Sequence, residues 1–293
     1  MIVISYFTIM ISWYQNFPLS MDPIAFTVGS FSVRWYALSY ITAFLVIYLV
    51  LMWRVKKEET KNITKISNDK FQNRKEIQNT ILDFLLVAFF AALIGGRIGY
   101  ILFYNFSYFL SHPLSIIWPF ENGSFVGFYG MSYHGGLIGI LIGSWLFLRW
   151  KKINFRAWAD FVIPAVPLGY FFGRVGNFLN GELYGRITNS PWGMYFTGDQ
   201  TSLRWPSQLI EAFLEGIALF AFLWLMRKKE TMKGKMLGVY FIGYGSLRIF
   251  GEFFREPDPQ IGLIFNFCTL GQILSLIMVL AGFLILLSKK PKK

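Results

Sequence analysis

The sequence predicts an all-α polytopic membrane protein, a bundle of seven transmembrane helices. Of its 293 residues, 55% are hydrophobic and only 15% are charged, and the mean hydropathy is +0.47. An ordinary soluble domain carries about 25% charged residues, so this composition excludes one. Most of the apolar stretches approach the roughly 20 residues that a helix needs to cross a bilayer. We expect spans at Tyr36–Trp53, Ile81–Tyr104, His134–Leu148, Trp158–Phe178, Leu209–Met226, Met236–Phe253 and Leu270–Leu287.

The distribution of lysine predicts the orientation of these spans. Every lysine falls in one of four polar segments, 54–80, 149–156, 227–235 and the C-terminal tail after 288. Segments rich in Lys and Arg remain in the cytoplasm, so we expect the N-terminus outside and the C-terminus inside. A net charge of +12 in a soluble domain would suggest nucleic acid. Here the charge is explained by topology, and we expect no nucleic-acid partner.

The basic residues outside these four segments are all arginines, and by this topology they lie in or beyond the outer half of the bilayer. They are Arg34, Arg97, Arg174, Arg186, Arg204, Arg248 and Arg255. Arginine binds phosphate through two parallel hydrogen bonds and keeps its charge when it is desolvated. Their placement therefore predicts recognition of an anionic group in the outer leaflet.

We interpret residues 1–293 as one integral-membrane domain with three attached segments. Residues 1–23 contain a short apolar stretch without a preceding basic residue, which fits an interfacial segment or an upstream extension better than a signal peptide. Residues 105–132 are aromatic and nearly uncharged, as expected of an arm that lies along the outer membrane surface. Residues 182–208, with two prolines and two tryptophans among them, predict a small ordered extracytoplasmic head.

The segment 173–186 concentrates polar residues at the end of an apolar run. Polar groups at membrane depth are costly and usually functional. If the segment is helical, Arg174, Asn177 and Gly181 share one face, where a guanidinium and an amide could hold a phosphate beside a gap. The competing interpretation is that Arg174 reaches the headgroups while the glycines tighten helix packing.

Two further helical faces carry charge and phenols. Arg97, Tyr100 and Tyr104 follow one another at helical spacing in the second span. Tyr244, Arg248, Glu252 and Arg255 do so in the sixth, where Glu252 can pair with both arginines. Each group could instead be an ion-paired strut between helices.

The candidate for acid–base chemistry is His134, which opens the third span on the same side as the arginines. A neutral imidazole could accept the proton of a thiol. His112, beside Pro113, is interpreted as structural. With one cysteine, Cys268, and two histidines, the chain predicts no metal site, and we expect no cofactor. No G-x-S-x-G motif is present, so the attacking atom should come from the acceptor substrate.

The run G-R-V-G-N-F-L-N-G-E-L-Y-G at 173–185 resembles the signature of the prolipoprotein diacylglyceryl transferase family. The resemblance extends from Met21 over nearly the whole chain, and its other motifs are Arg34-Trp35-Tyr36, 95–100, 134–136, 206–208 and 248–258. The leading residues 1–20 have no counterpart in it. Members of this family transfer the diacylglyceryl group of phosphatidylglycerol to the lipobox cysteine of a bacterial prolipoprotein. A thioether forms and glycerol 1-phosphate is released.

The resemblance implies a role for each matching residue. Arg174 and Arg248 would hold the phosphate, and His134 would be the base for the substrate thiol. Further residues would line or brace the substrate site: Tyr36, Arg97, Tyr100, Asn177, Asn180, Glu182, Tyr244 and Glu252. The implied partners are phosphatidylglycerol, signal peptides with a lipobox cysteine and the lipid bilayer. The implied location is the bacterial inner membrane.

The alternative from another functional class is a transporter or flippase for an anionic phospholipid. A transporter should show internal repeats and polar residues near the middle of the membrane. Here no repeat is visible and the ionisable residues crowd one leaflet. An intramembrane protease would need paired aspartates, a Ser–His pair or an H-E-x-x-H helix, none of which the sequence provides.

Overall fold

The computed structural model describes most of the chain, and most of the described residues are helical. It describes residues 2–29, 31–57, 73–104, 106–116, 120–121, 124–125, 131–257, 262–264 and 267–288. Within these ranges it describes the side chains of all residues except 2–7, 31, 103–104, 120–121, 124–125 and 133–134. The side chain of His134, the expected base, therefore lies outside the described part.

Every expected span falls on helical backbone. The α-helices are α1 (Ile2–Asn16), α2 (Trp35–Lys56), α4 (Arg74–Tyr104), α5 (Phe106–Ser111), α6 (Tyr133–Trp150), α7 (Phe155–Val162), α8 (Val166–Leu179), α9 (Ser207–Glu211), α10 (Leu219–Met226), α11 (Met236–Gly251) and α12 (Leu270–Leu287). Short 3₁₀ turns are η1 (Phe17–Ser20), η2 (Pro113–Ile116), η3 (Ile163–Ala165) and η5 (Glu230–Met232), and η4 (Ala212–Ala218) is a π-helix.

Four described helical segments are each long and apolar enough to cross a membrane. They are Trp35–Lys56, Arg74–Leu102, Ser207–Met226 and Leu270–Leu287. The chain is therefore built as a membrane protein, whereas the count of seven spans stays a prediction. The fourth expected span is broken at η3, which contains Pro164, and α8 begins directly after it with Pro167 in its first turn; neither proline can donate a backbone hydrogen bond. The fifth widens into η4 between α9 and α10.

Three small antiparallel hairpins accompany the helices, and the all-α expectation did not include them. β1 (Ile24–Val28) pairs with β2 (Phe31–Arg34), β3 (Phe120–Glu121) with β4 (Ser124–Phe125), and β5 (Met194–Phe196) with β6 (Asp199–Arg204). Strands this short carry little sequence pattern, because two to six residues give at most three alternations.

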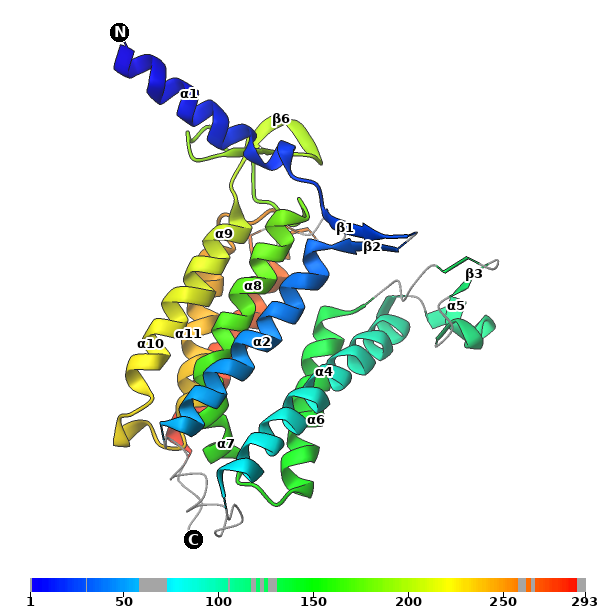
Figure 1. The fold of residues 1–293 in the computed structure, drawn as a ribbon, viewed down its shortest axis with the longest axis vertical. Coiled ribbons are helices and arrows are strands. Elements are labelled where there is room, and N and C mark those ends of the chain that lie inside the picture. The colour runs from blue at the N-terminus through cyan, green and yellow to red at the C-terminus, as the bar shows by residue number, and fades with distance from the viewer. Residues whose placement is uncertain are drawn as a thin grey trace. The chain divides into compact units, whose positions relative to one another are not determined.

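The chain divides into two compact units. The first contains residues 1–51 and 159–293, and the second contains residues 52–158. The first unit holds α8, α9, α10, α11 and α12 together with most of α2 (Figure 1).

Glycine permits close helix contacts in the first unit. A side chain at Gly176 of α8 would meet Ser39 of α2, and one at Gly216 of η4 would meet Phe171 of α8. The helices α11 and α12 pack along their length, with Gly238 opposite Gly282. Small residues let helix backbones approach closely. Such packing matters in a bilayer, because there is no hydrophobic driving force between helices that are surrounded by lipid.

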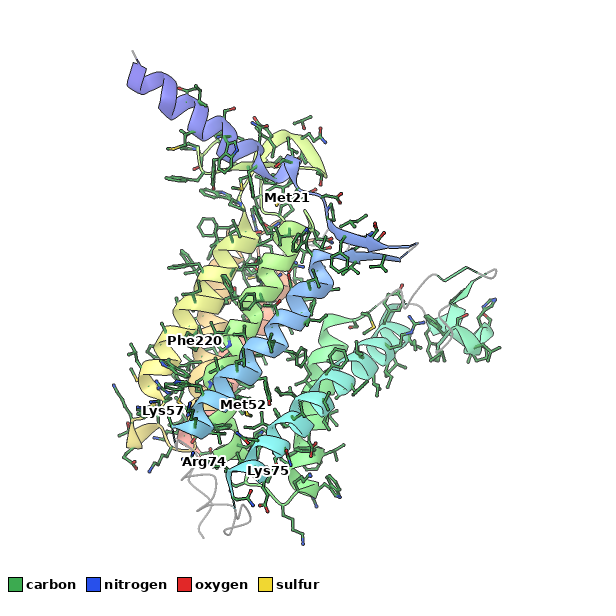
Figure 2. All side chains as sticks on the ribbon, viewed as in Figure 1. Met21, Met52, Lys57, Arg74, Lys75 and Phe220 are labelled. Carbon is green, nitrogen blue, oxygen red and sulfur yellow. The ribbon has the colours of Figure 1, made fainter. Side chains whose placement is uncertain are left out.

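The head, residues 182–208, is built on the β5–β6 hairpin at one end of the first unit. Phe196 and Met194 form its core with Phe178 of α8, and Met21 packs against them (Figure 2). The head is fixed to the end of α11, because the Arg186 amide donates to the Phe254 carbonyl at 2.9 Å.

The N-terminal helix α1 leads to this head. Tyr14 Oη donates to the Trp192 carbonyl at 3.0 Å, and Gln15 Nε2 donates to the Pro191 carbonyl at 3.2 Å. The ring of Phe17 stacks on that of Phe178. The sequence left open whether residues 1–23 are an interfacial segment or an extension. In the structure their helix contacts the head through its C-terminal turn.

In the second unit, α4 and α6 form a tight pair. Gly95 and Gly99 of α4 face Gly135 of α6 with backbone against backbone. Ser132 caps the start of α6 by accepting the Gly135 amide hydrogen bond, while its own amide donates to the Gly96 carbonyl at 2.9 Å. At its other end, α4 begins with Arg74 and Lys75, which Figure 2 labels. Part of the expected arm at 105–132 lies outside the described residues.

We predict that Gly282→Val destabilises the packing of α11 against α12. A Cβ atom at Gly282 would lie 2.8 Å from the Gly238 carbonyl oxygen, and backbone cannot move aside as a flexible side chain can. Such overpacking costs about 1–3 kcal/mol. Thermal unfolding in detergent should show a lower midpoint than the wild type, whereas Leu280→Val at an exposed position of α12 should change it little. Equal midpoints for the two variants would contradict this packing.

A second prediction concerns acid stability of the head. Hydrogen bonds from Arg204 Nε and Thr201 Oγ1 hold the pKa of Asp199 at about 2, below its ordinary value of 3.8. Because the folded pKa is depressed, the stabilisation is complete above about pH 4 and is lost as the pH falls toward 2. Pepsin cleavage of the wild-type head should accelerate over this window. The Asp199→Asn variant should already be cleaved readily at pH 4. If its cleavage rate depended on pH as the wild-type rate does, the stabilising role of the Asp199 carboxylate would be contradicted.

Candidate functional site

Three arginines surround one buried carboxylate inside the first unit. Glu211, the last residue of α9, is 1% exposed. Its Oε2 atom lies 2.8 Å from Arg174 Nε and 2.6 Å from Arg248 Nη1, and its Oε1 atom lies 3.9 Å from Arg255 Nη1. One carboxylate therefore links a guanidinium of α8 to two that come from α11 and the turn after it. We call Arg174, Glu211, Arg248, Glu252 and Arg255 the arginine cluster.

Glu252 completes the cluster on the far side of Arg248. Its Oε1 atom lies 2.5 Å from Arg248 Nη2 and 3.8 Å from Arg255 Nε. Its Oε2 atom accepts a hydrogen bond from Thr269 Oγ1 at 2.7 Å. The structure thus contains the pairing of Glu252 with both arginines that the helical spacing predicts. Thr269 also caps α12, so that helix is tied to the cluster.

Local helix geometry places each of these side chains. Tyr170, Arg174 and Asn177 follow one another at steps of four and three along α8, which puts them on one face. Arg174 Nε lies 2.7 Å from Tyr170 Oη, and Arg174 Nη1 donates to Asn177 Oδ1 at 3.2 Å. Its Nη2 atom has no hydrogen-bond partner among the described residues, so Arg174 retains donors for a ligand.

A second buried carboxyl group lies one turn beyond Glu211. Glu215 is fully buried, and its Oε1 atom lies 3.7 Å from Arg248 Nη1. It lies within the π-helical turn η4, and turns of this kind are frequent at functional sites. The adjacent Gly251 leaves room for this carboxyl group, since a Cβ there would lie 3.2 Å from its Oε1 atom.

The polar chain continues from the cluster to the end of α8. Asn177 Nδ2 donates to Glu182 Oε1 at 2.8 Å, and Gln208 Nε2 donates to the Glu182 backbone carbonyl at 2.7 Å. We expected the helical face of Arg174 and Asn177 to extend to Gly181, and this is wrong. The helix ends at Leu179, and Gly181 turns the chain with a positive φ of 68°, which glycine adopts without strain. This turn is what brings Glu182 back to Asn177.

The remaining expected site residues divide between the two units. Tyr36, Asn180 and Tyr244 belong to the first unit with the cluster, and the Tyr244 ring lies 5.5 Å from that of Tyr170. Arg97 and Tyr100 belong to the second unit. Arg97 donates to the carbonyls of Ser115 and Ile116 in the arm, at 2.5 and 3.0 Å, and lies over the Phe109 ring. These contacts fit the structural interpretation of Arg97 that the sequence left open.

The two histidines also lie in the second unit. The backbone of His134 lies in the first turn of α6, as expected. His112 stacks on Tyr108, and its Nδ1 atom lies 3.0 Å from Ser111 Oγ, contacts that agree with a structural role. Among the described residues, no three His, Cys, Asp or Glu side chains are grouped as metal ligands.

Sequence reasoning missed Glu211, Glu215 and Tyr170. The two glutamates were visible as carboxylates four residues apart inside the apolar run 209–226, where an ionisable residue is a functional candidate by default. Tyr170 gave no such signal, because a tyrosine in an aromatic-rich helix is ordinary.

Comparison of the sequence with known proteins identifies the family. The family model described as prolipoprotein diacylglyceryl transferase matches residues 23–288. The chain belongs to this family. Relatives named phosphatidylglycerol–prolipoprotein diacylglyceryl transferase include one from Chlorobaculum tepidum, 48% identical over 286 residues, covering 96% of this chain and 94% of the relative. Others come from Idiomarina loihiensis, 41% identical and covering 95% and 97%, and Rickettsia felis, 41% identical and covering 95% and 100%.

This membership makes the chain a transferase and removes the transporter alternative. The family model begins at residue 23, so α1 and η1 lie outside it. Tyr14, Gln15 and Phe17, which fix α1 to the head, therefore belong to a segment that the family model does not cover.

We predict that Glu211→Gln strongly destabilises the protein. Removing the shared negative charge leaves three largely buried guanidiniums with too few carboxylates, and breaking a buried ion pair costs about 3–5 kcal/mol. Thermal unfolding in detergent should show a large drop in the midpoint. The matched control is Glu230→Gln, whose side chain is 79% exposed and should change the midpoint little. A wild-type midpoint for Glu211→Gln would show that the cluster does not depend on this charge.

Proposed function

We propose that this protein transfers the diacylglyceryl group of phosphatidylglycerol to the thiol of a lipobox cysteine in an exported prolipoprotein. The relatives' names support the lipid donor and the protein acceptor. The single observation that carries the donor site is the arginine cluster, because two buried guanidiniums on different helices converge on one point. Arg174 and Arg248 hold the phosphate of the lipid there.

In the reaction, the cysteine sulfur attacks the glyceryl carbon that bears the phosphate ester. A carbon–sulfur bond forms and the carbon–oxygen bond breaks, so the phosphate leaves with the headgroup as glycerol 1-phosphate. The thiol proton passes to His134, which releases it to solvent. As the bond breaks, negative charge grows on the leaving phosphate, and fixed guanidiniums in a dry site stabilise this charge.

The other site residues orient these two arginines or line the space beside them. Tyr170 and Asn177 fix Arg174, and Glu252 fixes Arg248. Tyr36, Asn180 and Glu182 face the substrate, and Tyr244 packs against Tyr170.

We further propose that the chain is one integral-membrane domain of seven spans in the bacterial inner membrane, with its N-terminus outside and its C-terminus inside. The first unit supports this orientation. Its cluster and head lie at the C-terminal end of α11, whereas Lys233 and Lys235 precede the N-terminal end of that helix. Lysine marks the cytoplasmic side, so the cluster faces the outer leaflet. The head at 182–208 is then extracytoplasmic, and the arm at 105–132 lies along the outer surface.

The test combines purified protein, phosphatidylglycerol liposomes and a lipobox peptide that carries either cysteine or serine. Mass spectrometry should detect a diacylglyceryl adduct on the cysteine peptide alone. Arg174→Ala should lower its rate of formation by about a hundredfold or more, because a donor to the developing charge is lost. Arg149→Ala, at the exposed end of α6, is the matched control and should keep the wild-type rate. If the Arg174→Ala variant formed the adduct at the wild-type rate, the assignment of the phosphate site to the arginine cluster would be contradicted.

A further inference from the structure

An apolar groove of about 450 Å³ lies in the first unit, where the head meets the surface of α9 and η4. Its largest lining side chains, which come from α1, the head, η4, α11 and the turn after α11, are Tyr14, Trp192, Trp205, Phe213, Phe250 and Phe254. We propose that the groove binds an acyl chain of a membrane phospholipid and that α1 lies in the membrane interface beside it. The arginine cluster is a separate site, because Glu211 is 1% exposed whereas Phe213 is 58% exposed.

The chemistry of the lining fits a hydrocarbon chain. All ten lining residues are apolar or aromatic, and none of them carries a charge. The hydroxyl of Tyr14 is already used, since it donates to the Trp192 carbonyl at 3.0 Å. The groove therefore offers no charged partner to a phosphate or to an ionic side chain, whereas an apolar occupant is removed from water there at no polar cost. Its volume lies within the range of about 300–1,000 Å³ that ligand pockets have.

The groove lies at the level where headgroups give way to acyl chains. Phe213 is near the beginning of Ser207–Met226, a segment long and apolar enough to cross the membrane. Trp192 and Trp205 belong to the head, which precedes this segment. Tryptophan and tyrosine are enriched at membrane–water interfaces. The two tryptophans therefore mark the headgroup level and Phe213 the beginning of the hydrocarbon, so an acyl chain of the surrounding bilayer can enter the groove.

Helix α1 is both apolar and exposed. Residues 1–21 contain no Asp, Glu, Lys or Arg. Ile9 and Met10 are each 62% exposed, and Trp13 is 67% exposed. Exposed apolar surface of this extent marks a contact with a membrane or with another protein. Because Tyr14 of the same helix borders a groove at the headgroup level, the bilayer is the partner that covers both surfaces at once.

The direction of α1 agrees with a position in the interface. Figure 1 shows α1 running crosswise to α2 and α8 and extending outward from the head. Since α2 contains a segment that can cross the membrane, a helix crosswise to it runs along the membrane plane, as interfacial helices do. The hydrogen bonds of Tyr14 and Gln15 to carbonyls of the head hold α1 in this direction.

The position of α1 can be measured with nitroxide labels on the full chain in phospholipid nanodiscs. In a Cys268→Ser background, the labels are attached at Ile9→Cys on α1 and, as the control, at Gln200→Cys on the exposed strand β6 of the head. Oxygen concentrates in the bilayer and a nickel chelate stays in water. The ratio of collision rates with oxygen and with nickel should be several-fold higher at position 9 than at position 200.

The occupant of the groove can be measured by native mass spectrometry after transfer into detergent. The wild type should retain a phospholipid that Ile210→Trp, which fills the groove, loses. Leu280→Trp, at a position of α12 that is 55% exposed, is the matched control and should retain it. Tyr14→Ala removes one wall from outside the bundle, and should also lose the lipid if Ile210→Trp does not fold. Arg174→Ala should keep the lipid, because the groove does not use the arginine cluster.

Each outcome bears on the groove independently of the proposed reaction, because neither measurement depends on transfer to a peptide. Equal collision ratios at positions 9 and 200 would overturn the interfacial position of α1. A label at position 9 that is shielded from both reagents would indicate a second copy of the protein as the cover, and would overturn it as well. Retention of the lipid by the folded groove variants, or its loss in Arg174→Ala alone, would overturn the acyl-chain assignment.

Discussion

The ion pairs of Glu211 with Arg174 and Arg248 are the interaction on which the rest of the first unit depends. Three segments distant in sequence supply the partners: α8 gives one guanidinium, α11 the other, and α9 the carboxylate between them. Charges buried in a membrane protein are tolerated only when they are paired. The helices must therefore stay in one arrangement, since a shift of any of them by one turn would leave a buried charge without its partner.

This requirement explains several features that have no chemical role of their own. The π-helical turn η4 carries Glu215 toward Arg248 directly after Glu211. Gly251 and Gly271 lack side chains where a Cβ would contact the carboxylates of Glu215 and Glu252. Thr269 caps α12 and donates to Glu252 at the same time. Backbone irregularity and small residues are thus concentrated around the charges, where the helices must accommodate polar side chains at close range.

Much of this fold is readable from sequence, and the part that is not has a physical reason. Apolar runs locate the helices because burial in lipid demands about 20 apolar residues, and i, i+4 spacing pairs Arg248 with Glu252 because both lie on one helix. The link from Glu211 to Arg174 is different, because it joins two helices whose rotation and height are set by packing. The helical repeat of the sequence does not predict contacts between different helices. The short hairpins were missed because their strands are too short to show an alternation of apolar and polar residues. The turn at Gly181 was missed because we extended the helical repeat of α8 one turn too far.

The contacts within the cluster support the proposal that it binds the phosphate of the donor lipid. A guanidinium on a flexible surface side chain loses conformational entropy when it binds an anion. Here Tyr170, Asn177 and Glu211 already hold Arg174, and Glu211 and Glu252 already hold Arg248. The ordering is completed during folding, so a phosphate meets donors that need little rearrangement. The carboxylates that balance the arginines also limit how tightly an anion can be held. Such a limit suits a transferase, whose phosphate product must leave after every turnover.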